Sequence, residues 1–492
     1  MPQTLNILFL AAEAEPFVKV GGLGDVAGSL PRALRELSTA ITGDIKLDVR
    51  LVLPLHSVVR QDTVRPLQIF SIPRGDSEVQ VEAFESTLEG MPVYFITGEP
   101  IRASGSVYSS NTKLDIEKYT FFSLAALELT RYLNWTPDIL HANDWHTAMV
   151  AYFNLAKRWE DRSRQMTSLV EIHNLPFMGP NLKETLAAYR VPLAITDLPD
   201  WGRGLPLPLG LWASDMIVTV SPTYAEEILH PEFGCGLENF LQNRTGSLYG
   251  VLNGIDTRSF DPSTDTALAT PFQADTLSGR ARNKVHLQQR VDLPESPDVP
   301  LLAMVSRMDP AKGIDIALKG LKFLVRQNWQ LVILGAGDAA LESMAKKLQQ
   351  ELPDRVRVET RYDARLARQI YGGADVLLMP SRYEPCGISQ MLAMRYGCVP
   401  LVRAVGGLHD TVTDSETGFV FVEAKIKAFN DSLRRALALY PERSRWEGMQ
   451  KAGMAEDFSW TKSATRYFEI YKKMADQAFA PSVVRNGQLN QR

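Results

Sequence analysis

Short runs of apolar residues alternate along this chain with longer stretches in which apolar positions recur every three or four residues. The short runs are rich in β-branched residues and leucine, which is typical of buried strands, and the longer stretches are typical of amphipathic helices. This alternation predicts an α/β fold with a mostly parallel sheet and helices on both faces. In the first half of the chain the predicted strands are 7–11, 49–53, 93–96, 139–141, 169–173 and 217–220.

The alternation stops near residues 253–256 and resumes at residue 301. Between 262 and 300 the sequence is polar and rich in Asp, Thr, Ser and Pro, so we place a domain connection there. The length of 492 residues also exceeds what one core fills, roughly 250 to 300 residues. The second half then predicts another doubly wound domain with strands at 301–306, 331–334, 356–358, 376–379 and 399–402.

The last periodic segment predicts a helix with one apolar face at 459–473. Its Trp460, Ala464, Tyr467 and Tyr471 recur at spacings of three and four. We expect this helix to pack back on the first domain. The predicted organisation is a first domain at 1–260, a second at 261–457, the C-terminal helix at 458–476 and a disordered tail at 477–492.

Composition excludes several classes of protein. The 45% hydrophobic and 22% charged content is that of an ordinary globular chain, and the net charge of -4 gives no general attraction to nucleic acid. Three scattered cysteines argue against a disulfide framework and for a reducing compartment. No apolar run is long enough for a membrane helix, and residues 5–12 lack the basic region of a signal peptide, so we expect a cytoplasmic protein.

Two glycine-bearing loops follow predicted strands in the two halves. The first offers Lys19 and the backbone amides of Gly21 and Gly22 just before a helix predicted at 24–37, a combination suited to a phosphate. The alternative is a flexible surface loop with a solvated lysine. Because ligands of open parallel sheets lie beyond the carboxyl ends of the strands, the two loops together predict one phosphorylated sugar in a cleft between two sheets.

The second loop, 381–387, offers a carboxylate and further amides at the start of a helix predicted at 388–396. Glu384 can accept hydrogen bonds from sugar hydroxyls, and the amides can contact the same hydroxyls. Cys386 is an alternative nucleophile. No histidine neighbours it in sequence, so a buried thiol is the favoured interpretation.

Two segments match a dinucleotide-binding fingerprint, G-x-G-x-x-A. The match at 22–27 stands about ten residues past its strand, too far for that motif. The match at 335–340 follows its strand directly, and Glu359 stands where a ribose ligand would. NAD binding therefore stays open as an alternative, although any tight turn from strand to helix favours glycine.

Arg307 and Lys312 end the first strand of the second domain as two closely spaced cations. They could hold a diphosphate without a metal and stabilise the charge that develops as it leaves. The alternative is that they are surface cations that balance nearby acids.

The segment 141–146 closes a predicted strand with Asp144 and two histidines. A metal held by His141, Asp144 and His146 is one interpretation, but the spacing matches no standard metal motif. Asp144 as a helix cap is another. His173 also ends a strand, which favours a place in the site over a place in the core.

With these segments in view, the chain resembles the bacterial glycogen synthase and plant starch synthase family over nearly its whole length. Several independent motifs stand in the family's order, which is specific. They are K-x-G-G-L at 19–23, H-x-x-D-W-H at 141–146, H-N at 173–174, S-P-T-Y-A at 221–225, V-L-N-G-I-D at 251–256, the cation pair at 307 and 312, L-G-x-G-D at 334–338 and S-R-x-E-P-C-G at 381–387.

The resemblance implies a GT-B fold of two Rossmann-like domains with the C-terminal helix crossing back to the first. It implies transfer of glucose from ADP-glucose to the non-reducing end of an α-1,4-glucan such as glycogen, with retention of configuration and release of ADP. No metal or other cofactor is implied, and neither is a nucleic acid or membrane partner.

The resemblance also implies residue roles. Lys19, Arg307 and Lys312 would bind the diphosphate of ADP. Asp144, His173 and Glu384 would position the donor glucose. The remaining implied donor contacts are Gly21, Gly22, Asn253, Gly335, Tyr362, Cys386 and Gly387.

Two departures from the family pattern stand out. Val20 replaces a common threonine, and residues 175–178 read L-P-F-M in place of I-A-Y-Q beside His173, which bears on acceptor handling. Position 392 is leucine, where many other retaining GT-B enzymes carry a second glutamate; the resemblance implies the same absence throughout this family, so the ribose must be held otherwise.

The mechanism that we hypothesise is attack by the acceptor 4-hydroxyl from the face that ADP leaves, with domain closure excluding water and the leaving phosphate taking the proton. A double displacement through a glucosyl-enzyme adduct is the alternative. Rival functions are a transferase of the same fold that uses UDP-glucose or a small acceptor, and a catalytically silent nucleotide-sugar sensor. A glucan phosphorylase would need a pyridoxal lysine motif, and we find none.

Overall fold

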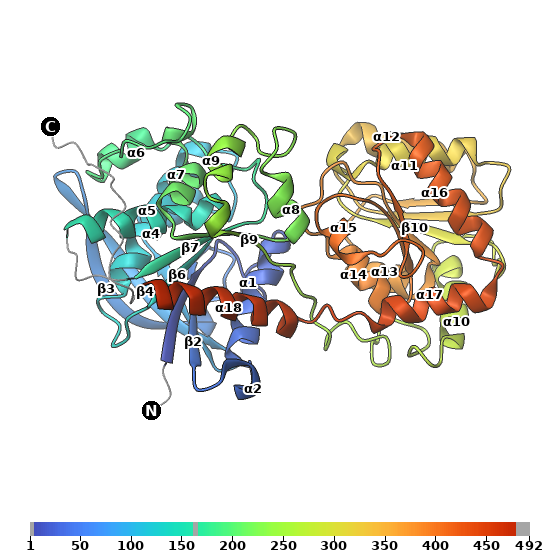
Figure 1. Cartoon of the computed structure of the whole chain (residues 1–492), viewed down its shortest axis with the longest axis horizontal. Coiled ribbons are helices and arrows are strands. Elements are labelled where there is room, and N and C mark those ends of the chain that lie inside the picture. The colour runs from blue at the N-terminus through green and yellow to red at the C-terminus, as the bar shows by residue number, and fades with distance from the viewer. Residues whose placement is uncertain (1–3, 161–165, 479–492) are drawn as a thin grey trace. The chain divides into compact units, whose positions relative to one another are not determined.

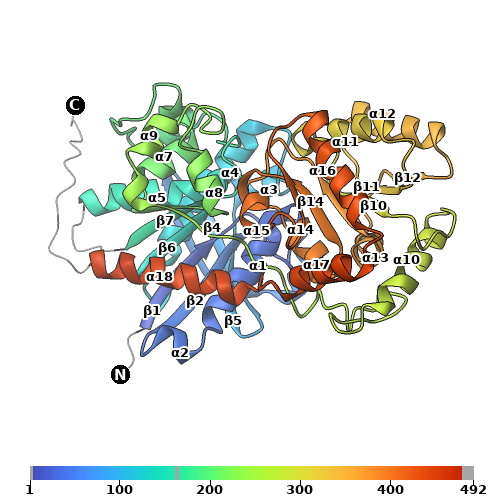
Figure 2. The same cartoon turned by 45° about the vertical axis from the view of Figure 1, so that its right-hand side comes forward.

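The computed structural model describes residues 4–160 and 166–478, and the chain divides into two compact units. Unit 1 contains the chain up to Val220, then Ala225–Gly254, and the chain from Trp460 onward. Unit 2 contains Ser221–Tyr224 and Ile255–Ser459. Each unit is an α/β fold built on one sheet (Figures 1 and 2).

The sheet of unit 1 has nine strands within the described residues, in the order β3-β4-β5-β2-β1-β6-β7-β8-β9. Neighbours from β5 to β9 in that order pair in parallel, and β3, β4 and β5 pair antiparallel. The strands are β1 (Thr4–Leu10), β2 (Lys46–Pro54), β3 (Arg65–Arg74), β4 (Ser77–Leu88), β5 (Met91–Thr97), β6 (Ile139–Asn143), β7 (Thr167–Ile172), β8 (Met216–Thr219) and β9 (Leu248–Gly250).

Helices cover both faces of this sheet. Ile7 and Phe9 on one face of β1 share a buried cluster with α1 and with the C-terminal helix α18, because alternate residues of a strand point to opposite faces. Figure 2 shows α5 and α7 on one side of strands β6 and β7 and α18 on the other. The helices are α1 (Gly22–Arg35), α2 (Thr39–Thr42), α3 (Glu99–Ser104), α4 (Thr112–Leu129), α5 (Asp144–Glu160), α6 (Lys183–Ala188), α7 (Pro206–Ala213), α8 (Pro222–Glu227), α9 (Glu238–Gln242) and α18 (Trp460–Ala478), with single 3₁₀ turns η1 (Gln61–Thr63), η2 (Gly202–Gly204) and η3 (Thr245–Ser247).

The sheet of unit 2 is parallel throughout, in the order β12-β11-β10-β13-β14-β15. Its strands are β10 (Leu301–Val305), β11 (Gln330–Leu334), β12 (Val356–Glu359), β13 (Val376–Met379), β14 (Val399–Arg403) and β15 (Phe419–Phe421). Its helices are α10 (Ser278–Arg290), α11 (Ile314–Phe323), α12 (Ala339–Glu351), α13 (Ala364–Gly373), α14 (Ser389–Arg395), α15 (Gly406–Thr411), α16 (Ile426–Leu439) and α17 (Arg443–Ala455), with the 3₁₀ turn η4 (Pro310–Lys312). The strand order reverses direction at β10, where a doubly wound sheet binds its ligand.

The structure confirms the predicted parallel strands of both halves, within a few residues at their ends. The hairpin of β3 and β4, whose many exposed positions give a polar pattern, was not predicted, and neither were the three-residue strands β9 and β15. Helix α1 begins at Gly22, earlier than the predicted start at Gly24. Unit 1 gives way to unit 2 after Gly254, ahead of the expected boundary at residue 260. Of the tail predicted to be disordered, residues 479–492 lie outside the described residues, and 477–478 still belong to α18.

No helix within residues 4–160 and 166–478 is long and apolar enough to cross a membrane.

Candidate active site

In unit 1 the predicted site residues lie past the carboxyl ends of β1, β6 and β7, which are neighbours in the sheet. Lys19 follows β1, Asp144 follows β6, and His173 follows β7. The parallel register brings these three positions to one edge of the sheet.

Lys19 is half-exposed and pairs with two carboxylates of its own loop. Its Nζ lies 2.5 Å from Asp25 Oδ1 and 3.0 Å from Glu15 Oε2. Burial acts to lower the pKa of Lys19, but the hydrogen bonds and charges of Asp25 and Glu15 outweigh it and raise that pKa. The lysine is therefore a cation, and its charge is already balanced within the loop.

The two glycines expected to meet a phosphate differ in what their amides do. The Gly21 amide lies 3.0 and 3.1 Å from the two oxygens of the buried Glu13 carboxylate, so it already has an acceptor. Gly22 opens α1, where the backbone amide has no acceptor inside the helix, and no atom lies within 4 Å of the position that a side chain there would take. Of the two, Gly22 is the one that leaves room for an anion.

Asp144 has φ of +52°, and its side chain is buried. Its Oδ1 accepts the backbone amides of His173 at 2.8 Å and Asn174 at 3.4 Å. The Asp144 carboxylate thus binds the backbone at the end of β7. These bonds do not support the alternative in which Asp144 caps its own helix. Burial raises the pKa of Asp144, although the nearby His173 and the amides act against that rise.

The hydrogen bonds of Asn143 fix the tautomer of His173. Asn143 Nδ2 donates to the Leu10 carbonyl at 2.8 Å, so the Oδ1 of the same amide is an acceptor. His173 Nε2 lies 2.9 Å from that Oδ1 and must donate to it. Its Nδ1 is the remaining ring nitrogen, on a side chain that is 12% exposed.

His141 lies in the core of unit 1, bonded on both sides. Its Nε2 lies 2.8 Å from Glu171 Oε2 and its Nδ1 lies 2.6 Å from the Tyr471 hydroxyl of α18. Burial lowers the pKa of His141. Burial acts to raise the pKa of Glu171, but the adjacent His173 and His141 hold it below the ordinary value. These opposing directions describe an ionised Glu171 that accepts from a neutral His141.

The metal interpretation of His141, Asp144 and His146 finds no support in this arrangement. His146 packs against the rings of Trp145 and Tyr119, at centroid distances of 4.1 and 4.7 Å, and burial lowers its pKa well below the ordinary value. Within the described part of the chain, no group of three or more His, Cys, Asp or Glu side chains could hold a metal ion.

In unit 2 the central feature is an ion pair between Lys312 and Glu384. The Lys312 Nζ lies 2.7 Å from both carboxylate oxygens of Glu384, and Ser381 Oγ donates to one of them at 3.1 Å. Glu384 is 7% exposed, and the Lys312 side chain is 22% exposed. The structure therefore joins a cation from the end of β10 to a carboxylate from the loop after β13.

A close backbone approach creates this pair. Gly313, with φ of +65°, lies so near the Pro380 carbonyl that a side chain carbon would fall 2.0 Å from its oxygen. The Ala311 carbonyl accepts the Arg382 amide at 2.7 Å, which fastens the η4 turn to the loop that carries Glu384. Glycine at 313 is thus required for Lys312 to reach its partner.

The other predicted donor contacts differ in exposure. Arg307 is exposed, and its guanidinium makes no hydrogen bond or ion pair with any residue that the structure describes. Tyr362, in the loop between β12 and α13, is 87% exposed. Asn253 belongs to unit 1 and is 7% exposed, and its Oδ1 has no hydrogen-bond partner among the described residues.

Gly335 packs against the end of β10. A side chain carbon there would fall 1.8 Å from the Ser306 carbonyl oxygen, and the Gly335 amide donates to the Glu359 carbonyl at 3.0 Å. The glycines of this fingerprint therefore serve backbone packing beside Arg307. Because its amide already has an acceptor, Gly335 offers a ligand no donor, which counts against the NAD alternative and equally against an amide contact from Gly335 to the donor sugar nucleotide.

Cys386 is buried, as the sequence analysis favoured. Gly387 has φ of +73° and precedes α14. The start of α15 lies so close to this loop that only glycine fits at Gly406 and Gly407. A side chain carbon at these positions would fall 2.1 Å from the backbone carbonyl oxygen of Glu384 and 2.2 Å from that of Cys386. The loop that carries Glu384 is therefore held from two sides.

Four residues at the site edge of unit 1 were not predicted from the sequence. Glu13 lies in the alanine-rich stretch after β1, two residues before Glu15, and nothing in the local sequence distinguishes the two acids. Asn143 and Glu171 stand at the ends of β6 and β7, but their partners come from other strands. Tyr108 contacts Glu13 from a loop 95 residues away, which no local pattern reveals.

Comparisons with known proteins agree with this architecture. The chain matches the family described as starch synthase catalytic domain at residues 6–243 and that described as glycosyl transferases group 1 at 286–451. It is 37% identical to the glycogen synthase of Clostridium novyi, covering 96% of this chain and 99% of that protein, and 38% identical to that of Syntrophotalea carbinolica with the same coverage. The catalytic domain of starch synthase IV from Arabidopsis thaliana, solved with ADP and acarbose, superposes with a TM-score of 0.85 and 31% identity over 96% of this chain and all of that one.

The two Rossmann-like units, together with the family matches in both halves of the chain, define a glycosyltransferase of the GT-B type. The chain belongs to the glycogen and starch synthase family. The predicted fold class and the predicted function of a glycogen or starch synthase, a glycosyltransferase, are confirmed.

Proposed function

We propose that this chain transfers glucose from ADP-glucose to the non-reducing end of an α-1,4-glucan such as glycogen, with retention of configuration and release of ADP. The observation that carries the proposal is the contact between Lys312 and both oxygens of Glu384. A nucleotide sugar has its phosphates and its sugar hydroxyls within a few bonds of each other. A lysine for phosphate and a carboxylate for hydroxyls, held together, fit that junction.

The residue roles follow the same chemistry. Arg307 and Lys312 bind the diphosphate and stabilise its charge as it leaves, and Lys19 binds phosphate on unit 1. Glu384 accepts from the glucose hydroxyls. Asp144 fixes the end of β7 and so orients His173, whose Nδ1 is the ring nitrogen left for a sugar hydroxyl.

In the reaction the bond between glucose C1 and the phosphate oxygen breaks while the acceptor O4 bonds to C1 from the same face. The proton of the acceptor hydroxyl passes to the departing phosphate, so no side chain forms an adduct. The chemistry as written uses no metal. A trapped glucosyl-enzyme adduct would instead support double displacement. We place the enzyme in the cytoplasm with no nucleic acid or membrane partner.

The first test is ADP release by the purified protein with ADP-glucose and glycogen, beside UDP-glucose and a control without acceptor. Acceptor-dependent release with ADP-glucose is the expected result. Nucleotide release with UDP-glucose alone would identify UDP-glucose as the donor. Nucleotide release without acceptor would indicate hydrolysis of the donor. Silence with both donors would overturn the proposal in favour of a sensor.

A further inference from the structure

The Lys19 loop folds around a buried carboxylate that the sequence motifs do not include. Glu13 is 1% exposed, and its side chain accepts the backbone amides of Val20 and Gly21. No lysine or arginine within the described residues pairs with it. A buried carboxylate needs such donors, so the positions of the two amides and of the carboxylate depend on one another.

A third donor holds Glu13 from the other side. The Tyr108 hydroxyl lies 2.9 Å from Glu13 Oε1. Tyr108 as a whole is 37% exposed, but desolvation at its hydroxyl and then the charge of Glu13 raise the pKa of Tyr108, so the phenol keeps its proton and donates. The Tyr108 ring also packs on His146, with 4.9 Å between the ring centroids.

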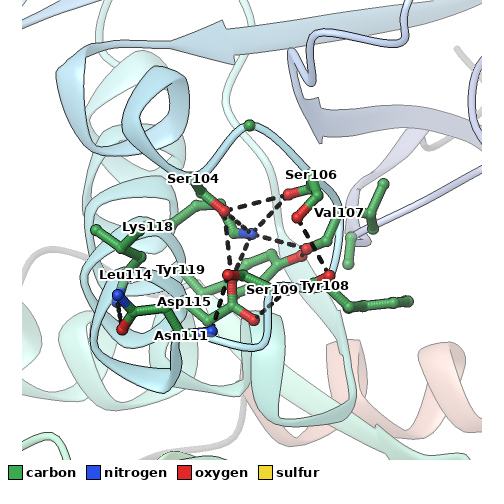
Figure 3. Close-up of polar contacts among 12 residues, drawn as sticks. Ser104, Ser106, Val107, Tyr108, Ser109, Asn111, Leu114, Asp115, Lys118 and Tyr119 are labelled. Carbon is green, nitrogen blue, oxygen red and sulfur yellow. Dashed lines mark hydrogen bonds and ion pairs between the residues drawn. The ribbon is translucent and has the colours of Figure 1, made fainter.

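The loop that presents Tyr108 is itself pinned by a fully buried lysine, as Figure 3 shows. Lys118 Nζ donates to the Val107 carbonyl at 2.7 Å, to the Ser106 carbonyl at 3.0 Å and to Ser104 Oγ at 2.8 Å. Lys118 Nζ also forms an ion pair with Asp115 Oδ1 at 2.7 Å, and Asp115 stands about one turn before Lys118 on α4.

The residues on either side of Tyr108 are fixed by this cluster. Asp115 Oδ2 accepts the Ser109 amide at 2.8 Å, and the Tyr119 hydroxyl donates to the Val107 carbonyl at 2.6 Å. Figure 3 shows these bonds converging on the loop from α4. A buried charge with four partners is costly to rearrange, so these contacts favour the observed backbone position on either side of Tyr108.

We propose that Glu13 is a positioning residue for the phosphate-binding loop, and that Tyr108 and the Lys118 cluster fix Glu13 in turn. By engaging the amides of Val20 and Gly21, the carboxylate sets the direction in which the chain enters α1. That direction aims the next amides, at the start of the helix, and the Lys19 side chain. The inference rests on the proposed function, in which the Lys19 loop binds the diphosphate of the donor.

The test compares the Glu13 pair with a matched pair in the same unit. Tyr189 donates to Glu117 Oε1 at the same distance of 2.9 Å, but Glu117 pairs with Arg74, also at 2.9 Å, and no loop amide bonds to it. The variants are Glu13→Gln and Tyr108→Phe, with Glu117→Gln and Tyr189→Phe as controls. The measurements are the Kd of ADP, KM for ADP-glucose and for glycogen, kcat and thermal unfolding.

Glu13→Gln keeps the size of the side chain but turns one acceptor into a donor that faces the loop amides. We expect about a tenfold weaker Kd for ADP and a matching rise in the donor KM, with the glycogen KM within about twofold. Tyr108→Phe should shift the same constants by about threefold. The two control variants should leave ADP affinity unchanged even where they lower the melting temperature.

A double variant provides the second criterion. Because Tyr108 acts through Glu13, Glu13→Gln with Tyr108→Phe should bind ADP about as weakly as Glu13→Gln alone. Unchanged or tighter ADP binding in Glu13→Gln, or full additivity in the double variant, would overturn the proposal. If Glu13→Gln does not fold, the threefold shift in Tyr108→Phe against Tyr189→Phe decides.

Lys19→Ala separates this inference from the proposed function. If Lys19→Ala leaves ADP binding unchanged, the assignment of the loop to the diphosphate is wrong. If Lys19→Ala weakens ADP binding and Glu13→Gln does not, the loop binds the donor and only the positioning role of Glu13 is wrong.

Discussion

The two units hold their candidate phosphate-binding lysines in different ways. Lys19 in unit 1 is 36% exposed and pairs with Glu15 and Asp25, four and six residues away in sequence. Lys312 in unit 2 is 22% exposed and meets Glu384, 72 residues away, through both oxygens. One cation is balanced by its own loop, and the other depends on the packing of two strand ends.

The difference predicts how each lysine responds to change. A half-exposed local pair contributes about 1 kcal/mol or less and is weakened by salt. Removing one partner of a buried pair leaves a charge without compensation and costs more. Lys312 should therefore tolerate substitution worse than Lys19.

The largest expected effect is that of Lys312→Ala. We expect kcat to fall roughly 10²-fold or more, since deletion of one charge-stabilising group typically costs that much. The melting temperature should also fall, because Glu384 stays buried without its cation. ADP release from ADP-glucose and glycogen measures the first effect, below the melting temperature of the variant.

The control for that variant is Lys319→Ala. Lys319 lies on α11, is 52% exposed and pairs with Asp315 at 3.6 Å. Its loss should change neither kcat nor stability appreciably. An unchanged kcat in Lys312→Ala would remove that lysine from the mechanism.

Asp144→Asn should lower kcat by about tenfold, because His173 loses a charged anchor and a small displacement at a reacting centre is costly. Asparagine tolerates the positive φ at this position. Because folding raises the pKa of Asp144, the stability that its protonated form provides is complete below the unfolded pKa of about 4 and is lost as pH rises through the folded pKa. The variant should therefore be at least as stable as the parent at pH 7, and the advantage should shrink toward pH 4.

Asp138→Asn is the matched control for this pH profile. Burial also raises the pKa of Asp138, which precedes β6 and accepts the Asn6 amide at 2.8 Å at the opposite edge of the sheet. Denaturant unfolding of Asp138→Asn across pH 4 to 7 should show the same trend of stability with pH. Its kcat should be unchanged. A loss of stability at pH 7 in Asp144→Asn would contradict the assigned direction.

The smallest expected effect is that of Asp25→Asn. Removing one of the two carboxylates at Lys19 should tighten ADP binding by up to about fivefold, and the gain should fade as salt rises. Titration calorimetry at low and high ionic strength measures both. Asp431→Asn, which breaks an exposed pair with Lys427 on α16, should change nothing. Weaker ADP binding in Asp25→Asn would mean that Asp25 orients Lys19 rather than competing for it.

The same contrast explains what could be predicted from the sequence. Apolar runs such as 301–305, which are buried on both faces of the sheet, predict parallel strands. Motifs such as 19–23 predict the glycine-bearing loops. The partner of Lys312 could not be read from spacing, because the η4 turn meets the loop after β13 only through the backbone approach at Gly313. Glu13 and Tyr108 were missed for the same reason, since their contact spans 95 residues. Residues that act within one loop can be predicted from the sequence, whereas their partners from distant parts of the chain cannot.

Helix α18 gives the chain a particular order of completion during synthesis. Trp460, Tyr467 and Tyr471 are buried in the core of unit 1, and the Tyr471 hydroxyl closes the hydrogen bond to His141. These residues leave the ribosome after the whole of unit 2. The first unit to be translated is therefore the last to acquire its full core, and a nascent chain stopped short of residue 460 carries an exposed apolar face on α1 and the sheet.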